Sequence, residues 1–177
     1  MALEQFNGVA PVLRQGVWVH PQATIIGACT LHEDVGIWPQ AVLRGDVNTI
    51  EVGARTNIQD GAVVHVTHES EQSRGAPVII GAEVTVGHQA VLHGCIIEDA
   101  CLIGMGAIVL DHAHVETEVM VGAGSLVPPG KVLQSGWLYL GSPVKAVRRL
   151  SEQERQFLRY SAQHYVELKD KYAQSGR

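Results

Sequence analysis

"IEDACLIGMGAIVLDHAHVETEVMVGAGSLV", residues 97–127, carries an aliphatic side chain at every sixth position. The recurring residues are Ile97, Ile103, Val109, Val115, Val121 and Val127. A period of six residues is the signature of a parallel β-helix, in which each unit forms one side of a triangular coil and three units complete one turn. We therefore predict an all-β chain in which the recurring aliphatic side chains point into the centre of the coil.

The same period extends toward the N-terminus, with three interruptions. Earlier members of the series are Val19, Ile25, Leu31, Ile37, Leu43, Val52, Ile58, Val64, Ile80, Val86 and Leu92. After Leu43, Val64 and Leu92, the next member follows nine, sixteen and five residues later instead of six. The longest interruption contains THESEQSRGAPV, residues 67–78, a polar segment with Gly and Pro that predicts a loop leaving the coil. We expect the left-handed form of the coil, which hexapeptide repeats adopt as an exception to the usual right-handed crossover.

The C-terminal part of the chain has a different pattern. Residues 1–137, including a short N-terminal segment, are predicted to form the β-helix, and residues 138–177 an extended crossing segment and a C-terminal α-helix packed on the coil. Ser151 and Glu154 match the S-x-x-E capping box with which helices begin. Apolar side chains then recur at three-to-four spacing, at Phe157, Leu158, Ala162, Tyr165, Leu168 and Tyr172. We expect this apolar face to pack against the coil.

Composition excludes several classes of protein. A formal net charge of −5 and a sequence pI near 6.0 are unlike the basic surfaces that bind nucleic acids or anionic membranes. No apolar run approaches the roughly 20 residues of a membrane span, and the first residues lack the basic and apolar segments of a signal peptide. We therefore expect a cytoplasmic protein that binds neither nucleic acid nor membrane.

The three cysteines, Cys29, Cys95 and Cys101, are an odd number without a CxxC pair. This pattern argues against a disulfide framework or a zinc knuckle and favours buried thiols. Cys29 and Cys101 also occupy a position of the repeat where small residues are expected, which supports their burial.

Counting the sides of the coil brings two histidines together. Val64 and Leu92 begin the same side of successive turns, so His65 and His93, each one residue later, stack at the strand spacing of about 4.8 Å. Arg44 belongs to the same column, one turn earlier. We therefore expect His65 and His93 to be able to share one metal ion.

A third histidine, His88, falls on the adjacent side of the coil, above Asp60. Around a three-fold axis, the His88 side of one subunit would face the side of its neighbour that carries His65 and His93. Three imidazoles and one water are the open tetrahedral arrangement of a catalytic zinc site. We therefore predict a homotrimer in which His65, His88 and His93 hold metal ions between subunits.

Three motifs resemble those of the gamma-class carbonic anhydrases and their bacterial relatives: RGD at 44–46, NIQDGAVVH at 57–65 and VGHQAVLHG at 86–94. GSLVP at 124–128 and YLGSPVK at 139–145 extend the resemblance along nearly the whole chain. The resemblance implies reversible hydration of carbon dioxide to bicarbonate by hydroxide formed from metal-bound water. Zinc is the expected metal, although imidazole ligands also accept iron(II) and cobalt(II).

The resemblance also implies roles for residues around the ligands. Gln59 corresponds to a glutamine that orients the metal-bound water or hydroxide. Arg44 and Asp46 correspond to a pair at the subunit interface, and Asp60 would orient a ligand ring by accepting its hydrogen bond. Tyr139 is similar to a tyrosine that some relatives place at the mouth of the site.

Some residues depart from the family pattern. Val47 stands where the best-characterised enzymes of the class have a glutamate, and neither Glu69 nor Glu71 aligns with their proton shuttle. Because hydration requires rapid export of a proton, we expect low activity. His112 and His114 do not occupy the ligand position of their side, so we expect neither to bind the metal.

Two other classes of function remain open at this stage. Hexapeptide acyltransferases share the GSPVK segment, bind coenzyme A between subunits and use one histidine as general base, without a metal. A non-catalytic relative could instead keep the metal as a structural element. Tightly bound zinc would argue against the acyltransferase, and carbon dioxide hydration kinetics would separate the enzyme from the structural relative. Other substrates, such as thioesters, could be hydrolysed at the same metal site.

Overall fold

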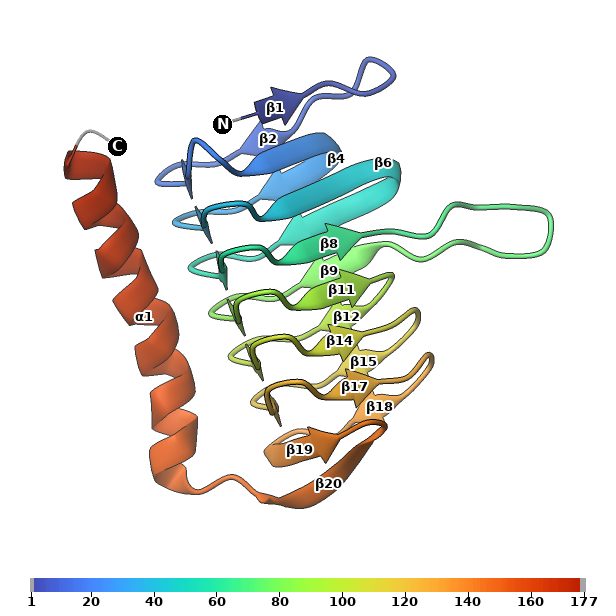
Figure 1. Ribbon diagram of the computed structural model, residues 1–177, viewed down its shortest axis with the longest axis vertical. Coiled ribbons are helices and arrows are strands. Elements are labelled where there is room, and N and C mark those ends of the chain that lie inside the picture. The colour runs from blue at the N-terminus through green and yellow to red at the C-terminus, as the bar shows by residue number, and fades with distance from the viewer. Residues whose placement is uncertain (1, 176–177) are drawn as a thin grey trace.

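The computed structural model describes residues 2–175 and is a left-handed parallel β-helix with one C-terminal helix, which confirms the predicted fold class (Figure 1). The first strands are β1 (Ala2–Glu4), β2 (Val12–Leu13), β3 (Trp18–Val19), β4 (Thr24–Leu31), β5 (Gly36–Ile37), β6 (Val42–Val52), β7 (Asn57–Ile58), β8 (Val63–His65), β9 (Val78–Ile80) and β10 (Thr85–Val86). The chain continues with β11 (Val91–His93), β12 (Ile96–Ile97), β13 (Leu102–Ile103), β14 (Ile108–Val109), β15 (His114–Val115), β16 (Met120–Val121), β17 (Leu126–Val127), β18 (Val132–Leu133), β19 (Trp137–Gly141), β20 (Val144–Arg149) and α1 (Glu152–Gln174).

The coil has three faces, each a parallel sheet with strands from successive turns. The first face contains β8, β11, β14 and β17, and the third contains β9, β12, β15 and β18. The long strand β6 turns a corner, because its first residues pair with β8 and its last residues pair with β9. The second face contains β3, β5, β7, β10, β13, β16 and β19, and its last neighbour β20 is antiparallel.

The core consists of the aliphatic residues that the six-residue period identifies. Val64 pairs with Leu92 and Leu92 with Val109, so the predicted register across the interruptions is confirmed. All three side chains are fully buried. Truncation of such an aliphatic side chain to alanine costs about 2–5 kcal/mol, so the stacked aliphatic residues are the main source of stability.

Close packing of successive turns requires glycine at particular corners. A Cβ atom on Gly104 would lie 2.5 Å from the Ala123 amide nitrogen on the next turn. Real Cβ atoms do not approach backbone so closely, so the repeat needs a residue without a side chain there.

Residues 66–77 leave the coil between β8 and β9, as the polar interruption predicts (Figure 1). Thr67 and Ala76 form an antiparallel bridge at the base of this loop, and Ser70 pairs with Ser73 near its tip. The bridge at the base brings the two ends of the loop together, so that β9 can pair with β6 on the third face.

Helix α1 runs back along the second face toward the N-terminal turns (Figure 1). The predicted capping box is present: the Ser151 hydroxyl accepts a hydrogen bond from the Glu154 amide, and the Glu154 carboxylate accepts one from the Ser151 amide. The tyrosines of the predicted apolar face, Tyr165 and Tyr172, pack edge-on against Trp38.

The buried side of the helix differs from the predicted stripe at three positions. Ser161 is buried and hydrogen-bonds the Thr85 hydroxyl. Phe157 is 49% exposed, whereas Lys169 is buried with 1% exposure. The Lys169 ammonium pairs with Asp34 at 3.1 Å and with Asp170 at 2.6 Å. A lysine can bury its aliphatic stem when its charged end reaches carboxylates, a possibility that an apolar pattern does not show.

The three cysteine thiols are free and buried, as predicted. Burial raises the pKa of Cys29 to about 11 and the pKa values of Cys95 and Cys101 to about 12. The thiols are therefore protonated at neutral pH and are poor metal ligands. No helix among residues 2–175 is long and apolar enough to cross a membrane.

Candidate metal centre

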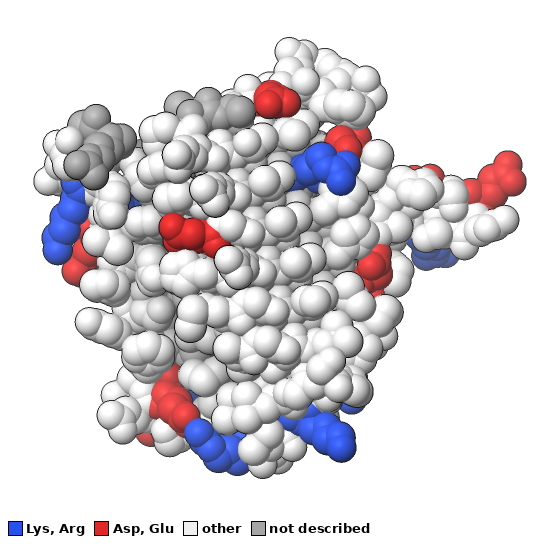
Figure 2. Space-filling model, viewed as in Figure 1, with Lys and Arg blue, Asp and Glu red and all other residues white. Residues whose placement is uncertain are grey.

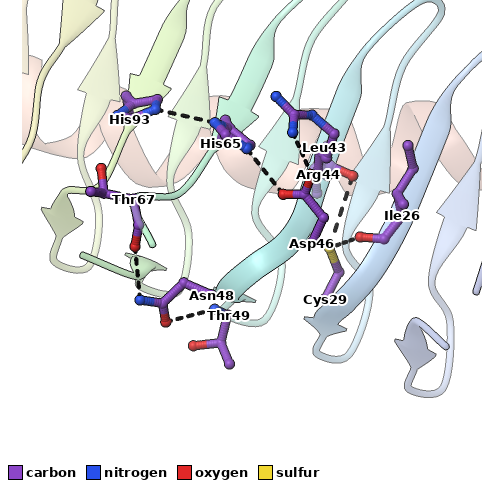
Figure 3. Close-up of polar contacts among 10 residues, drawn as sticks. All are labelled: Ile26, Cys29, Leu43, Arg44, Asp46, Asn48, Thr49, His65, Thr67 and His93. Carbon is purple, nitrogen blue, oxygen red and sulfur yellow. Dashed lines mark hydrogen bonds and ion pairs between the residues drawn. The ribbon is translucent and has the colours of Figure 1, made fainter. Parts of the chain in front are cut away.

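His65 on β8 and His93 on β11 are direct neighbours on the first face, as the face count predicts. The His65 Nδ1 and His93 Nε2 atoms face each other at 3.1 Å, and the ring centroids are 5.1 Å apart (Figure 3). Zinc–nitrogen bonds of 2.0–2.1 Å in a tetrahedral site place two ligand nitrogens about 3.3–3.4 Å apart. The observed pair therefore fits an ion of this kind with little movement.

A carboxylate holds the far side of the His65 ring. The His65 Nε2 atom is 3.1 Å from Asp46 Oδ1, and Arg44 donates to Asp46 Oδ2 at 2.5 Å (Figure 3). Burial alone would raise the Asp46 pKa, but hydrogen bonds from Arg44 and His65 outweigh it and lower that pKa below its ordinary value. Asp46 is therefore ionised at neutral pH and fixes the orientation of His65. In this single chain, Arg44 pairs with Asp46, and Asp46 also contacts His65.

A second carboxylate, which the sequence did not suggest, holds His93. The His93 Nδ1 atom is 2.9 Å from Asp111 Oδ2, and the Thr67 hydroxyl donates to the other oxygen of Asp111. Burial would raise the Asp111 pKa, but the hydrogen bonds from Thr67 and His93 lower it. Extending the histidine column by one turn leads to Leu110, whereas Asp111 lies at the corner beside Gly94, so the face count does not find it.

His88 and Gln59 lie on the second face rather than with the other two histidines. His88 Nδ1 is 2.9 Å from Asp60 Oδ2, which confirms that these residues stack on successive turns. Gln59, one residue before Asp60, is only 5% exposed, and its amide donates to Asn57 at 3.1 Å. Both residues line a mainly apolar cavity of about 450 Å³ between this face and helix α1.

Tyr139 and Tyr165 lie in different surroundings in the structure. Tyr139 lies inside the last turn of the coil, 5% exposed, where its hydroxyl accepts a hydrogen bond from the Gln134 amide. It stacks below Val121, on turns beyond those of the histidines, so it does not lie at the mouth of the site. Tyr165 of helix α1 lines the cavity beside His88 and Gln59 instead.

The Tyr165 phenol lies near the charge of Asp60 and the amide of Gln59. Burial and the negative charge of Asp60 raise its pKa, while a hydrogen bond with Gln59 opposes the shift. Tyr165 is therefore a protonated phenol in contact with a residue of the expected site. The predicted packing of Tyr165 against the coil is also present, because its ring contacts Trp38 edge-on.

His112 and His114 lie apart from these residues. His112 is a corner residue with a φ of +59°, and His114 on the third face pairs with Glu98 at 2.7 Å. His114 thus shows a histidine–carboxylate pair on a face where no metal ligand is predicted. Within residues 2–175 of one chain, no group of three or more His, Cys, Asp or Glu side chains is arranged to hold an ion.

The fold and these residues define a hexapeptide-repeat protein, and a solved structure supports this class. The crystal structure of a hexapeptide transferase family protein from Anaplasma phagocytophilum superimposes with a TM-score of 0.90. It is 39% identical in sequence, and the match covers 97% of this chain and 98% of that one. No protein-family model matches the sequence.

Relatives of known name narrow the class. Protein YrdA of Escherichia coli is 53% identical over 175 residues, which cover 98% of this chain and 95% of that protein. The mitochondrial gamma carbonic anhydrase 2 of Arabidopsis thaliana is 43% identical over 159 residues, 90% of this chain and 57% of the plant protein. The chain therefore belongs to the gamma carbonic anhydrase-like family of hexapeptide-repeat proteins.

Proposed function

We propose that this protein is a metal-dependent carbonic anhydrase of the gamma type, which converts carbon dioxide to bicarbonate. The observation that carries the proposal is the 3.1 Å approach of His65 Nδ1 to His93 Nε2, with each ring held from behind by a carboxylate. Membership of a family that includes gamma carbonic anhydrases supports it. Zinc is the proposed ion, because three neutral imidazoles suit it and leave a position for water.

The third ligand in this proposal is His88 of a neighbouring subunit in a homotrimer. His88 is on a different face from the other two histidines, and its Nδ1 atom is paired with the Asp60 carboxylate. The other nitrogen is then available to an ion held by His65 and His93 of the next chain. The proposal thus requires assembly, since one chain does not supply all three ligands at one place.

An ion bound there would make its water acidic enough to supply a nucleophile for carbon dioxide near neutral pH. Gln59 can orient that water through a neutral amide without adding charge to the site. Tyr165 and apolar side chains line the cavity beside His88, which remains partly open to solvent. The chain has no obvious glutamate shuttle, because Val47 stands where characterised enzymes have a glutamate and Glu69 and Glu71 are exposed on the loop that leaves the coil. Proton export therefore depends on a diffusible base in this proposal.

The test combines zinc analysis with stopped-flow hydration of carbon dioxide on the intact protein. We expect one zinc per chain and a rate that rises with the concentration of an imidazole-type buffer. His93→Ala should lose most zinc and activity, whereas the double variant His112→Ala with His114→Ala should keep both. Gln59→Ala should lower the rate and keep the zinc.

Two results would contradict the proposal. One is absence of hydration above the His93→Ala control at every buffer concentration, in protein that contains full zinc. The other is equal loss of zinc from His93→Ala and from the double variant, which would mean that the ligand set is wrong.

Acyl transfer is the second candidate, because the Anaplasma structure carries the name of a transferase family. His88, paired with Asp60 beside the 450 Å³ cavity, could serve as a general base for it. Transfer from acetyl-coenzyme A that persists after zinc is removed by a chelator would favour this candidate over hydration.

A further inference from the structure

The two carboxylates behind His65 and His93 determine where the ring protons lie. A neutral imidazole has one N–H donor and one lone pair, and an ionised carboxylate only accepts hydrogen bonds. His65 therefore donates from Nε2 to Asp46, and His93 donates from Nδ1 to Asp111. The lone pairs remain on His65 Nδ1 and His93 Nε2.

These lone pairs are the atoms that face each other at 3.1 Å. Two acceptors without a hydrogen between them repel, so the pair cannot form an ordinary hydrogen bond in this protonation state. A cation between the two nitrogens removes the repulsion. If one ring instead carried its proton on the nitrogen that faces the other ring, the two histidines would form a hydrogen bond with each other. The lone pair needed for an ion would then be occupied.

We propose that Asp111 is a positioning residue of the metal centre, which fixes His93 as the Nδ1–H tautomer and thereby keeps the Nε2 lone pair for an ion. The value of this role to the protein rests on the proposed function. The tautomer itself is a property of the metal-free chain and can be tested without metal.

The surroundings of Asp111 are built to hold its carboxylate in this place. A Cβ atom on Gly94 would lie 2.7 Å from Asp111 Oδ1, so the glycine leaves the space that the carboxylate fills. The Thr67 hydroxyl donates to that same oxygen. Thr67 is itself held by backbone pairing with Ala76 and by the Asn48 amide, which donates to its carbonyl at 3.0 Å (Figure 3).

A second corner aspartate shows what Asp111 does differently. Asp99 also fills the space beside a glycine of the preceding turn, Gly81, but its carboxylate accepts a hydrogen bond from the Ala82 amide at 2.7 Å. Asp99 therefore stabilises the backbone of the coil, whereas Asp111 binds an imidazole. This difference makes Asp99→Ala a matched control for Asp111→Ala.

The experiment measures the His93 tautomer and the affinity for zinc in the two variants. Nitrogen-15 NMR of the metal-free protein, at alkaline pH where imidazoles are neutral, should show His93 protonated on Nδ1 in the wild type. In Asp111→Ala the proton should move to Nε2, where it can bond His65. Chelator competition should show a zinc dissociation constant about 10- to 100-fold higher. Asp99→Ala should lower the melting temperature but change neither reading.

The inference is overturned if His93 keeps the Nδ1 proton in Asp111→Ala, or if that variant binds zinc as tightly as the wild type. It is also overturned if Asp99→Ala weakens zinc binding equally, because the effect would then come from the coil in general. If the wild type bound no zinc, the proposed function would fail, and the tautomer measurement alone would decide the role of Asp111. Thr67→Val, which keeps the carboxylate, should give a smaller loss of affinity than Asp111→Ala.

Discussion

The histidine pair on the first face depends on residues from other turns of the coil. Asp46 precedes His65 by one turn and Asp111 follows His93, and each carboxylate is itself held by a further partner, Arg44 or Thr67. Local changes beside these carboxylates should therefore alter metal binding without removing a ligand. The glycine next to Asp111 provides the clearest case.

Gly94→Ala should weaken zinc binding through Asp111. The new Cβ would crowd both Asp111 Oδ1 at 2.7 Å and the Ala76 Cβ at 2.8 Å, so the carboxylate must move from His93. A left-handed backbone, with a φ of +53°, adds a cost of about 1–2 kcal/mol to folding. Chemical unfolding and chelator competition measure the two effects separately.

Gly106→Ala is the matched control for this prediction. Gly106 has a φ of +64°, but a Cβ atom added there would meet nothing within 4 Å, so only the backbone cost should remain. Equal zinc affinity in the two variants would show that crowding at Asp111 does not matter.

The residues of the candidate site differ in how far the sequence could predict them. The stacking of His65 on His93 and of His88 near Asp60 follows from the six-residue period, because the strands of one face pair in the same register. Asp111 is at a corner, where the direction of a side chain depends on the turn and not on the strand period. The ligand roles themselves remain predictions.

Among the elements, helix α1 is held at its start by an ion pair as well as by its cap. Arg148 of β20 donates to both oxygens of Glu154 at 2.7 Å, and Glu154 also accepts from Ser151. The hydrogen bonds from Arg148, followed by those from Ser151, lower the Glu154 pKa to about 2 from an ordinary value of 4.5. The cap therefore joins the helix to the last strand of the coil.

Glu154→Gln should lower the melting temperature at neutral pH but have little effect in strong acid. Because the folded-state pKa is lowered, the stabilisation is fully present above about 4.5 and is lost as the pH falls toward 2. The difference between the melting temperatures of the two proteins should be constant above about pH 5 and shrink as the pH falls toward 2. Glu152→Gln is the control, since Glu152 shares the first turn but accepts its hydrogen bond from Gln156. A difference that did not shrink in acid would rule out this role for the charge.

The docking of helix α1 was only partly predictable. Its existence and its cap follow from local sequence, since Ser151 and Glu154 lie in the same turn. Its rotation on the coil does not, because the second face offers Trp18 and Trp38 as an aromatic surface that the helix pattern does not contain. Tyr172 and the stem of Lys169 pack there, and Phe157 remains half exposed.

At the scale of the whole molecule, apolar side chains are partly exposed on both the first and the third face of the coil. Charged side chains are sparse over the body of the coil in Figure 2 and gather toward its ends and on the projecting loop. On the first face, Val63 and Ile108 are partly exposed in the same sheet as His65 and His93. These side chains would be covered if that face met a neighbouring subunit.

Ile108→Glu should dissociate the proposed trimer and reduce its zinc content while all three histidines remain. A charge buried at an interface without a partner is costly, and Ile108 is 38% exposed on β14, next to β11. Ile96→Glu is the control, because Ile96 is equally exposed at 39% but lies on the third face. Sedimentation analysis and zinc measurement on the same samples provide the test. Dissociation by Ile96→Glu and not by Ile108→Glu would assign the interface to the third face.

The direction of helix α1 also has a consequence for synthesis of the chain. Each turn of the coil pairs with turns made shortly before it, so coiling can follow the ribosome as the chain emerges. The helix is different, because it is made after all the turns and yet packs on β3, β5, β7 and β10. Trp18 and Trp38 on the early turns are therefore not covered by the helix until Tyr165 and Tyr172 have been synthesised. The second face of the nascent coil therefore exposes aromatic side chains for most of its synthesis. We expect a chaperone to bind the nascent chain on that face.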